Sequence, residues 1–222
     1  TYFVSGLAAQ YVKVVLSGDG GDEFFGGYDS YRRLLKINKS ATWIRMGSPL
    51  FKVISSMMPL QTKGRRFLNM LAKGPDQTYA NFLSFDEREK KVMFHADILP
   101  LIEKDSAVEI KLKYLRESRT DDFLSKMQEL DIKTYMADDC LTKVARVGVA
   151  HALEVRMPLI DHEMFAIAAR IPSALKIKSG VGKHIFRKAV KPGIPNEIFD
   201  RPKKGFTIPL QKWLKDDLYD YS

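Results

Sequence analysis

Apolar residues recur at helical spacing along most of this 222-residue chain. A first amphipathic stretch covers residues 2–10. In residues 24–35, apolar side chains return every three or four positions, at Phe24, Phe25, Tyr28, Tyr31, Leu34 and Leu35. Farther along, prolines and glycines divide the sequence into shorter segments, at Pro49, Pro59, Gly64, Gly74, Pro75 and Pro100. This pattern predicts a chain built mainly from short helices.

Four aspartates stand directly before apolar helical stretches, where a carboxylate can accept hydrogen bonds from the free N–H groups of the first turn. The expected helices are 77–83 after Asp76, 123–135 after Asp121, 140–150 after Asp138 and 163–171 after Asp161.

One segment favours a strand. Residues 12–16 are rich in β-branched valine and end at Ser17-Gly18, which is a typical strand boundary. Because one strand cannot form a sheet, we expect its partners to lie upstream, outside this chain. A strand, a glycine-rich turn and a helix also make up one step of a parallel α/β sheet. No repeat or linker interrupts the pattern, so we expect a single unit over residues 1–222.

Composition and charge narrow the class of protein. The chain has 36 Lys+Arg against 27 Asp+Glu, a formal charge of +9, but its basic residues are dispersed among acidic ones. This dispersal, without a zinc-finger or ribonucleoprotein motif, argues against a nucleic-acid partner. No apolar run is long enough for a membrane span. The single cysteine, Cys140, fits a reducing compartment, so we expect a cytoplasmic protein.

The segment following the strand carries the clearest chemistry. Residues 17–23 have the sequence Ser-Gly-Asp-Gly-Gly-Asp-Glu. Glycines let backbone N–H groups turn toward an anion, and such loops lie where α/β sheets bind ligands. The carboxylates would repel phosphate unless Mg²⁺ lies between them. The loop therefore indicates a Mg-pyrophosphate site, with a tight turn stabilised by Asp22 and Glu23 as the alternative.

Four longer segments resemble the ATP-dependent synthetase domain of the asparagine synthetase (glutamine-hydrolysing) family. They follow one another in family order, at residues 14–28, 143–146 with 153–162, 182–187 and 201–209. Residues 37–126 contribute little to the resemblance. The implied fold is the C-terminal part of an α/β ATP-pyrophosphatase-type (adenine nucleotide alpha hydrolase-like) domain, mainly α in this chain, with most of its parallel sheet upstream.

The resemblance implies an amide-forming ligase. Family members activate a carboxylate with ATP as an acyl-adenylate, which ammonia from glutamine then converts to the amide. The printed sequence contains neither a Ser-Gly-Gly-x-Asp-Ser loop nor a glutaminase domain with its cysteine nucleophile. We therefore expect a fragment of a longer enzyme, inactive in isolation, acting on aspartate or a related carboxylate. A homodimer is one expected assembly.

The resemblance also assigns the nucleotide contacts. It implies that Ser17 and Gly18 contact ATP, that Gly20 and Gly21 hold its phosphates through the loop backbone, and that Asp22 binds Mg²⁺.

Two further residues receive catalytic roles from the resemblance. Asp19 occupies the acidic position that forms or uses the adenylate, where many members have glutamate, and Lys183 matches the lysine that stabilises the transition state of adenylation. Lys203 is a weaker candidate for a phosphate contact. Glu154 and Arg156 flank an apolar segment, which favours a buried or interfacial ion pair between them.

Some positions depart from the family pattern. Members commonly have aspartate where Ala145 stands and a Ser-Met pair where Gly148-Val149 stands, on a helix that faces the substrate. These departures put aspartate as the substrate in doubt. A β-lactam-forming relative and a degenerate, non-catalytic domain are therefore kept as alternatives. Cys140 and the four histidines show no metal-ligand spacing.

Overall fold

The computed structural model describes residues 1–39, 41–59, 62–81, 87–104, 106–199, 201 and 208–221. The chain divides into two compact units, Thr1–Phe186 and Arg187–Ser222. The elements that begin in the first unit are α1 Tyr2–Ala9, β1 Val14–Leu16, α2 Gly21–Phe25, α3 Asp29–Lys39, α4 Ala41–Met57, α5 Arg65–Lys73, α6 Pro75–Ala80, α7 Glu87–Met93, α8 Leu99–Lys104, α9 Ala107–Glu117, α10 Phe123–Asp131, the π-helix η1 Ile132–Leu141, α11 Thr142–Ala150, β2 Glu154–Arg156, the 3-10 turn η2 Pro158–Ile160, α12 His162–Arg170, α13 Ser173–Lys176 and α14 His184–Val190. The chain is thus mainly helical, as the hydrophobic pattern predicts.

The second unit is small. After the end of α14 it contains η3 Lys191–Gly193, α15 Asn196–Phe199, α16 Leu210–Lys215 and η4 Tyr219–Tyr221. Within it, the guanidinium of Arg187 lies 4.9 Å from the centre of the Phe199 ring and donates a 2.9 Å hydrogen bond to the carbonyl of the same residue.

The strand after α1 has a partner within this chain. β1 pairs in parallel with β2, with Val14 opposite Glu154, Val15 opposite Val155 and Leu16 opposite Arg156. The expectation of a single strand was therefore wrong. β2 has only three residues, two of them charged and exposed, so it carries no hydrophobic alternation from which it could be recognised.

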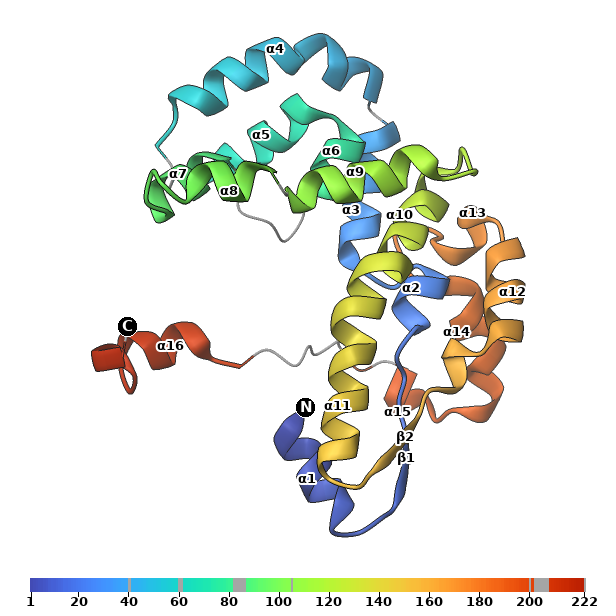
Figure 1. Ribbon diagram of the computed structural model, residues 1–222. Helices are drawn as coiled ribbons and strands as arrows, with labels where there is room; N and C mark the ends of the chain where they lie inside the picture. The colour runs from blue at the N-terminus through green and yellow to red at the C-terminus, as the bar shows by residue number, and fades with distance from the viewer. Residues whose placement is uncertain are drawn as a thin grey trace. The chain divides into compact units, whose positions relative to one another are not determined.

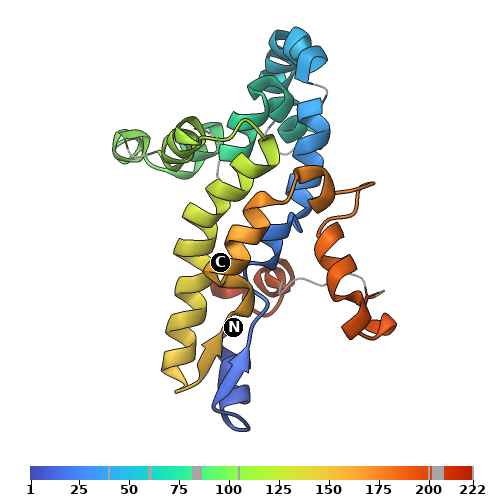
Figure 2. The ribbon, with the colours of Figure 1, turned by 90° about the vertical axis from the view of Figure 1, so that its right-hand side faces the viewer.

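The helices from residue 123 to residue 150 follow one another without a break. In Figures 1 and 2, α10, η1 and α11 form one long column, with α11 beside the two strands. Asp138 lies inside η1, so the helix start expected there is wrong. The cap of α10 is Asp122 rather than Asp121, and its carboxylate accepts a 2.8 Å hydrogen bond from the N–H of Ser125. Asp76 lies inside the first turn of α6 and does not cap it.

Two buried clusters hold the first unit together. One joins α3, α6, α9 and α10 around Tyr31, Tyr79 and Leu124. The other places Phe24 and Phe25 of α2 against Met136 and Ala168. Figure 1 shows α4–α9 grouped at one end of this unit and the strand pair toward the other. Among the described residues, no helix is both long and apolar enough to cross a membrane.

The cap expected at Asp161 is confirmed. Its carboxylate accepts hydrogen bonds from the N–H groups of Glu163 at 2.8 Å and Met164 at 3.4 Å, and α12 begins at the next residue. Replacing Asp161 with alanine leaves these donors to water. We expect the opening free energy of α12 to fall by about 1 kcal/mol, measured by native-state hydrogen exchange of its amides in the full-length protein.

Asp76→Ala is the matched control, because that carboxylate makes no capping hydrogen bond to α6. If Asp76→Ala lowered the protection of α6 as much as Asp161→Ala lowers that of α12, the capping hydrogen bonds of Asp161 would have no specific effect.

Candidate functional site

The loop of residues 17–20 lies at the carboxyl end of the parallel strand pair. The N–H of Ser17 donates a 2.8 Å hydrogen bond to the carbonyl of Arg156, which extends the ladder by one residue. The hydroxyl of Ser17 then donates to the carboxylate of half-buried Asp19. Gly18 is exposed, and no heavy atom lies within 4 Å of the place where its Cβ would stand. The backbone is therefore open to a ligand at this point.

Glycine is required where the loop turns into α2. Gly20 has a left-handed backbone with φ of 86°, and a Cβ there would lie 2.6 Å from Cγ1 of Ile160. Its carbonyl accepts a 2.9 Å hydrogen bond from the N–H of Phe24, which closes the first turn of α2. A Cβ at Gly21 would lie 3.0 Å from Leu159 and 3.4 Å from Nζ of Lys183. The loop thus packs against residues 159–160, which follow β2.

The structure brings Asp22 and Lys183 together from distant parts of the sequence. Nζ of Lys183 lies 3.2 Å from Oδ1 of Asp22, and the two side chains are 28% and 23% exposed. Lys183 has a positive φ of 53°, and its N–H donates a 3.2 Å hydrogen bond to the carbonyl of Phe25. A predicted catalytic residue and a predicted metal ligand therefore meet beside the glycine-rich loop.

Two glycines outside the predicted set allow this approach. A Cβ at Gly27 would lie 1.9 Å from Oδ1 of Asp22 and 2.2 Å from Cε of Lys183. A Cβ at Gly182 would lie 2.6 Å from the carbonyl oxygen of Gly26. Both belong to the recognised segments 14–28 and 182–187, but only the fold shows that they face each other.

The buried side of α2 carries a set of polar contacts that the sequence did not indicate. Glu23 is 3% exposed, and its carboxylate accepts a 2.6 Å hydrogen bond from the hydroxyl of Tyr28. Burial, followed by this bond to Glu23, raises the pKa of Tyr28 well above its ordinary value. The side-chain amide of Gln128 donates to the backbone carbonyl of Glu23 and accepts a 2.8 Å hydrogen bond from Nζ of Lys176.

The sequence was compared with those of known protein families. The asparagine synthase family profile matches residues 1–222, which is the whole chain. This chain belongs to the asparagine synthase family.

The family assignment agrees with individual relatives. The chain is 34% identical to asparagine synthetase [glutamine-hydrolyzing] 1 of Bacillus subtilis over 99% of its own length, and 32% identical to a putative asparagine synthetase of Mycobacterium bovis over 96%. It is 25% identical over 92% of its length to the amidase chry2 of Gibberella zeae. The chain spans about a third of the length of these relatives. No solved structure gives a significant match.

The departures from the family pattern fall on α11. Ala145 is exposed on this helix. Gly148 is buried, and a Cβ there would lie 2.9 Å from the carbonyl oxygen of Leu153 and 3.2 Å from Cγ2 of Val155. The serine that members of the asparagine synthase family commonly place here would therefore press against the backbone that leads into β2.

The ion pair expected at β2 exists but is not buried. Nε of Arg156 lies 2.7 Å from Oε1 of Glu154, and the two side chains are 64% and 57% exposed. Side chains two apart on a strand share one face, which brings them together, and this face is open to solvent. Lys203 lies outside the described residues.

The described residues near the loop could supply only some of the ligands of a metal ion. Within the described ranges, no three His, Cys, Asp or Glu residues are grouped as a metal cage would require. Asp19 accepts from Ser17, which leaves Asp22 as the carboxylate beside Lys183. Mg²⁺ that is bound with a nucleotide takes most of its ligands from phosphate and water and only one or two from carboxylates. The residues therefore fit one protein ligand to such an ion, at Asp22.

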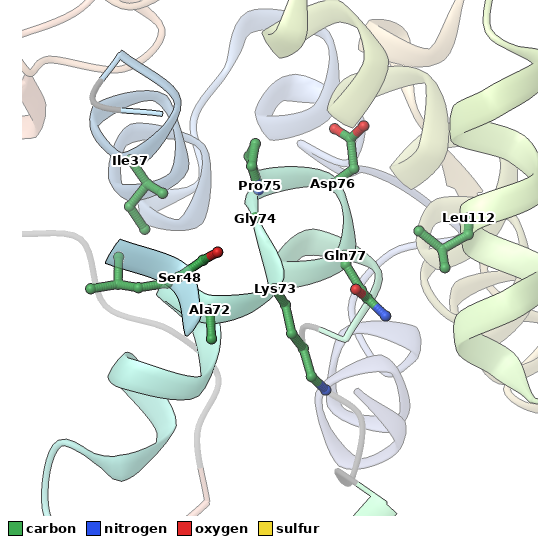
Figure 3. Close-up of a pocket in the computed structure, with 10 residues that line it drawn as sticks. Ile37, Ser48, Ala72, Lys73, Gly74, Pro75, Asp76, Gln77 and Leu112 are labelled. Atoms are coloured by element: carbon green, nitrogen blue, oxygen red, sulfur yellow. The ribbon is translucent and has the colours of Figure 1, made fainter. Parts of the chain in front are cut away.

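Two of the cavities in the described part of the first unit lie outside the loop of residues 17–20. One of about 450 Å³ lies among α4, α5, α6 and α9, and Figure 3 shows Lys73 and Asp76 extending to opposite sides of it. None of the predicted site residues lines this cavity. The other, of about 360 Å³, borders the buried side of α2 and is lined in part by Glu23, Gln128 and Lys176.

Proposed function

We propose that this chain forms the ATP-binding and carboxylate-activating part of a longer amide-forming enzyme. The first reaction would join a carboxylate to AMP and release pyrophosphate, and ammonia derived from glutamine would then displace AMP. The substrate would be aspartate or a similar carboxylate, as the names of the asparagine synthetase relatives suggest. We also expect the full protein to act in the cytoplasm. A homodimer is its expected assembly.

The observation that carries this proposal is the meeting of Asp22 and Lys183, 3.2 Å apart, beside an open glycine-rich loop. An ammonium group held there can stabilise negative charge that develops on a departing pyrophosphate, because it is already in position when the charge forms. Ser17, Gly18, Gly20 and Gly21 would bind the nucleotide through the loop. Asp19, oriented by the Ser17 hydroxyl, would act at the adenylate by positioning the incoming amine.

Mg²⁺, when bound by Asp22, would neutralise part of the phosphate charge. The carboxylate of Asp22 also keeps the ammonium of Lys183 at the loop in the structure described here. Asp22 would therefore serve both the ion and the lysine.

Pyrophosphate exchange in the full-length protein tests the proposal. The protein is incubated with Mg-ATP, labelled pyrophosphate and a panel of carboxylates that includes aspartate. We expect label to enter ATP only when an accepted carboxylate is present. A full-length protein that binds Mg-ATP but catalyses no exchange with any of them would support the degenerate-domain alternative. Release of a cyclised product without glutamine would support the β-lactam-forming alternative.

Asp22→Asn addresses the metal ligand. A neutral amide attracts a divalent cation less than a carboxylate does, so we expect the Mg²⁺ concentration for half-maximal exchange to rise at least about tenfold. The control is Asp97→Asn, because the Asp97 side chain is 87% exposed and its ion pair is with the exposed side chain of His95. An unchanged Mg²⁺ dependence in Asp22→Asn would contradict the assignment.

A further inference from the structure

Three buried polar side chains lie on or next to the short helix that carries Asp22. Glu23 of α2, Gln128 of α10 and Lys176 of α13 are each no more than 4% exposed. Lysine and glutamate are rarely buried to this extent unless they are paired. They form a chain of hydrogen bonds. Lys176 donates to the side chain of Gln128, which donates in turn to the backbone of α2.

The lysine determines how the glutamine amide is oriented. An ammonium group only donates hydrogen bonds, so the side-chain oxygen of Gln128 must face Nζ of Lys176, 2.8 Å away. The amide NH₂ then faces the opposite way and donates to the carbonyl of Glu23. Without Lys176, the two ends of the amide could exchange places and present an acceptor to that carbonyl.

The carbonyl of Glu23 receives this donor because α2 ends early. In a continuing helix it would accept a hydrogen bond from the N–H four residues later, which is that of Gly27. The backbone of Gly26 is left-handed, with φ of 71°, and the N–H of Gly27 donates instead to the carbonyl of Asp22 at 2.9 Å. Gln128 therefore satisfies a carbonyl that the end of the helix would leave without its usual partner.

We propose that Lys176 and Gln128 are positioning residues that hold α2 in the orientation in which Asp22 faces Lys183. This inference rests on the proposed function, since it concerns the rate of that reaction. The contact points are adjacent: Gln128 binds the backbone of Glu23, and Asp22 is the preceding residue of the same five-residue helix. The N-cap residue of α2, Gly20, provides no side-chain hydrogen bond, so the contact from Gln128 at the other end bears directly on the placement of this helix.

The burial of Lys176 has a cost that packing does not require. Desolvation lowers the pKa of Lys176, and the negative charge of Asp122 opposes this shift only in part. An apolar side chain of similar length could fill the same space without that cost. Lys176→Met removes that cost but leaves the buried oxygen of Gln128 without its donor, so we expect the free energy of unfolding to change little while the amide of Gln128 loses its orientation.

Two substitutions in the full-length protein separate positioning from packing. Gln128→Glu keeps the shape and an acceptor for Lys176 but turns an oxygen toward the Glu23 carbonyl, and Lys176→Met removes the orienting donor. We expect each to lower carboxylate-dependent pyrophosphate exchange by about 10- to 100-fold. We also expect faster hydrogen exchange confined to residues 20–27, with a nearly unchanged urea midpoint in Lys176→Met.

Gln77→Glu and Lys178→Met make the same chemical changes at exposed positions and should leave both measurements unaltered. The double variant Gln128→Glu with Lys176→Met should lose little more activity than either single one, because both act on one carbonyl. Additive losses, or full activity and unchanged exchange at residues 20–27 in the single variants, would overturn the inference. A wild-type protein without pyrophosphate exchange would count against the proposed function, and hydrogen exchange at residues 20–27 would still decide whether Lys176 and Gln128 hold α2.

Discussion

Replacing Lys183 with alanine in the full-length protein is expected to lower the rate of pyrophosphate release by about 10²- to 10³-fold, the usual loss for one preorganised charge-stabilising donor. The ammonium of Lys183 lies 3.2 Å from Asp22 beside the nucleotide loop, held by a left-handed backbone and by a hydrogen bond to Phe25. The effect should appear in kcat and in kcat/KM alike, because the contact strengthens in the transition state.

Folding should survive this change. The Lys183–Asp22 pair is about a quarter exposed, and ion pairs that water reaches contribute little to stability. Lys178→Ala, at an exposed position five residues earlier, serves as the control for removing a lysine from the same loop. An unchanged rate of pyrophosphate release in Lys183→Ala, or an equal loss in Lys178→Ala, would contradict the role of Lys183.

Gly27→Ala is expected to have the second large effect. The added methyl carbon would lie 1.9 Å from Oδ1 of Asp22 and 2.2 Å from Cε of Lys183, so it must separate these side chains. Both contacts involve the ends of side chains that can rotate away. The substitution should therefore disturb the site while lowering the free energy of unfolding only a little. Because displacement by about 1 Å can reduce a rate by about 10²-fold, we expect a loss of that size in pyrophosphate exchange.

Gly193→Ala controls for the change from glycine to alanine, because nothing lies within 4 Å of the Cβ that it would add. The urea midpoint of each variant measures any general destabilisation. If Gly27→Ala kept the wild-type rate, the pairing of Asp22 with Lys183 beside the loop would not matter for turnover.

The sequence predicts the nucleotide side of the candidate site more completely than its support. Six predicted residues, 17–22, occupy one loop and the start of the helix after it, so a short contiguous motif reveals them, and family resemblance adds Lys183. Gln128 and Lys176 contact the helix that carries Asp22, but the sequence does not predict this role for them. Their sequence surroundings are those of ordinary helix residues, and only the three-dimensional fold brings them to Glu23. Gly27 is recognisable as part of the motif, but its contact with Lys183 is not.

The fold was predictable where local chemistry decides it. Asp161 caps α12 because its carboxylate has nearby N–H groups to bind, whatever the rest of the chain does. Asp138 has the same local signal, yet the helical backbone continues past it through η1 into α11. β2 depends wholly on a partner far along the chain, since Glu154 and Arg156 give no strand pattern of their own. Local signals therefore identify helix starts that tertiary contacts do not override.

The pairing of β1 with β2 also has a consequence for how the molecule assembles. The two strands stand before and after most of the helices of the first unit, and α3, α4, α5, α6, α9 and α10 contact one another between them. Neighbouring helices close short loops, although α3 also contacts α10, where the Tyr31 hydroxyl donates to Asp131 100 residues later. The strand pair closes a still longer loop and bears a larger entropic cost. A chain with its helices formed but its ladder still open therefore has most of its secondary structure and no nucleotide loop. The competence of the site therefore reports this long-range pairing rather than helix content.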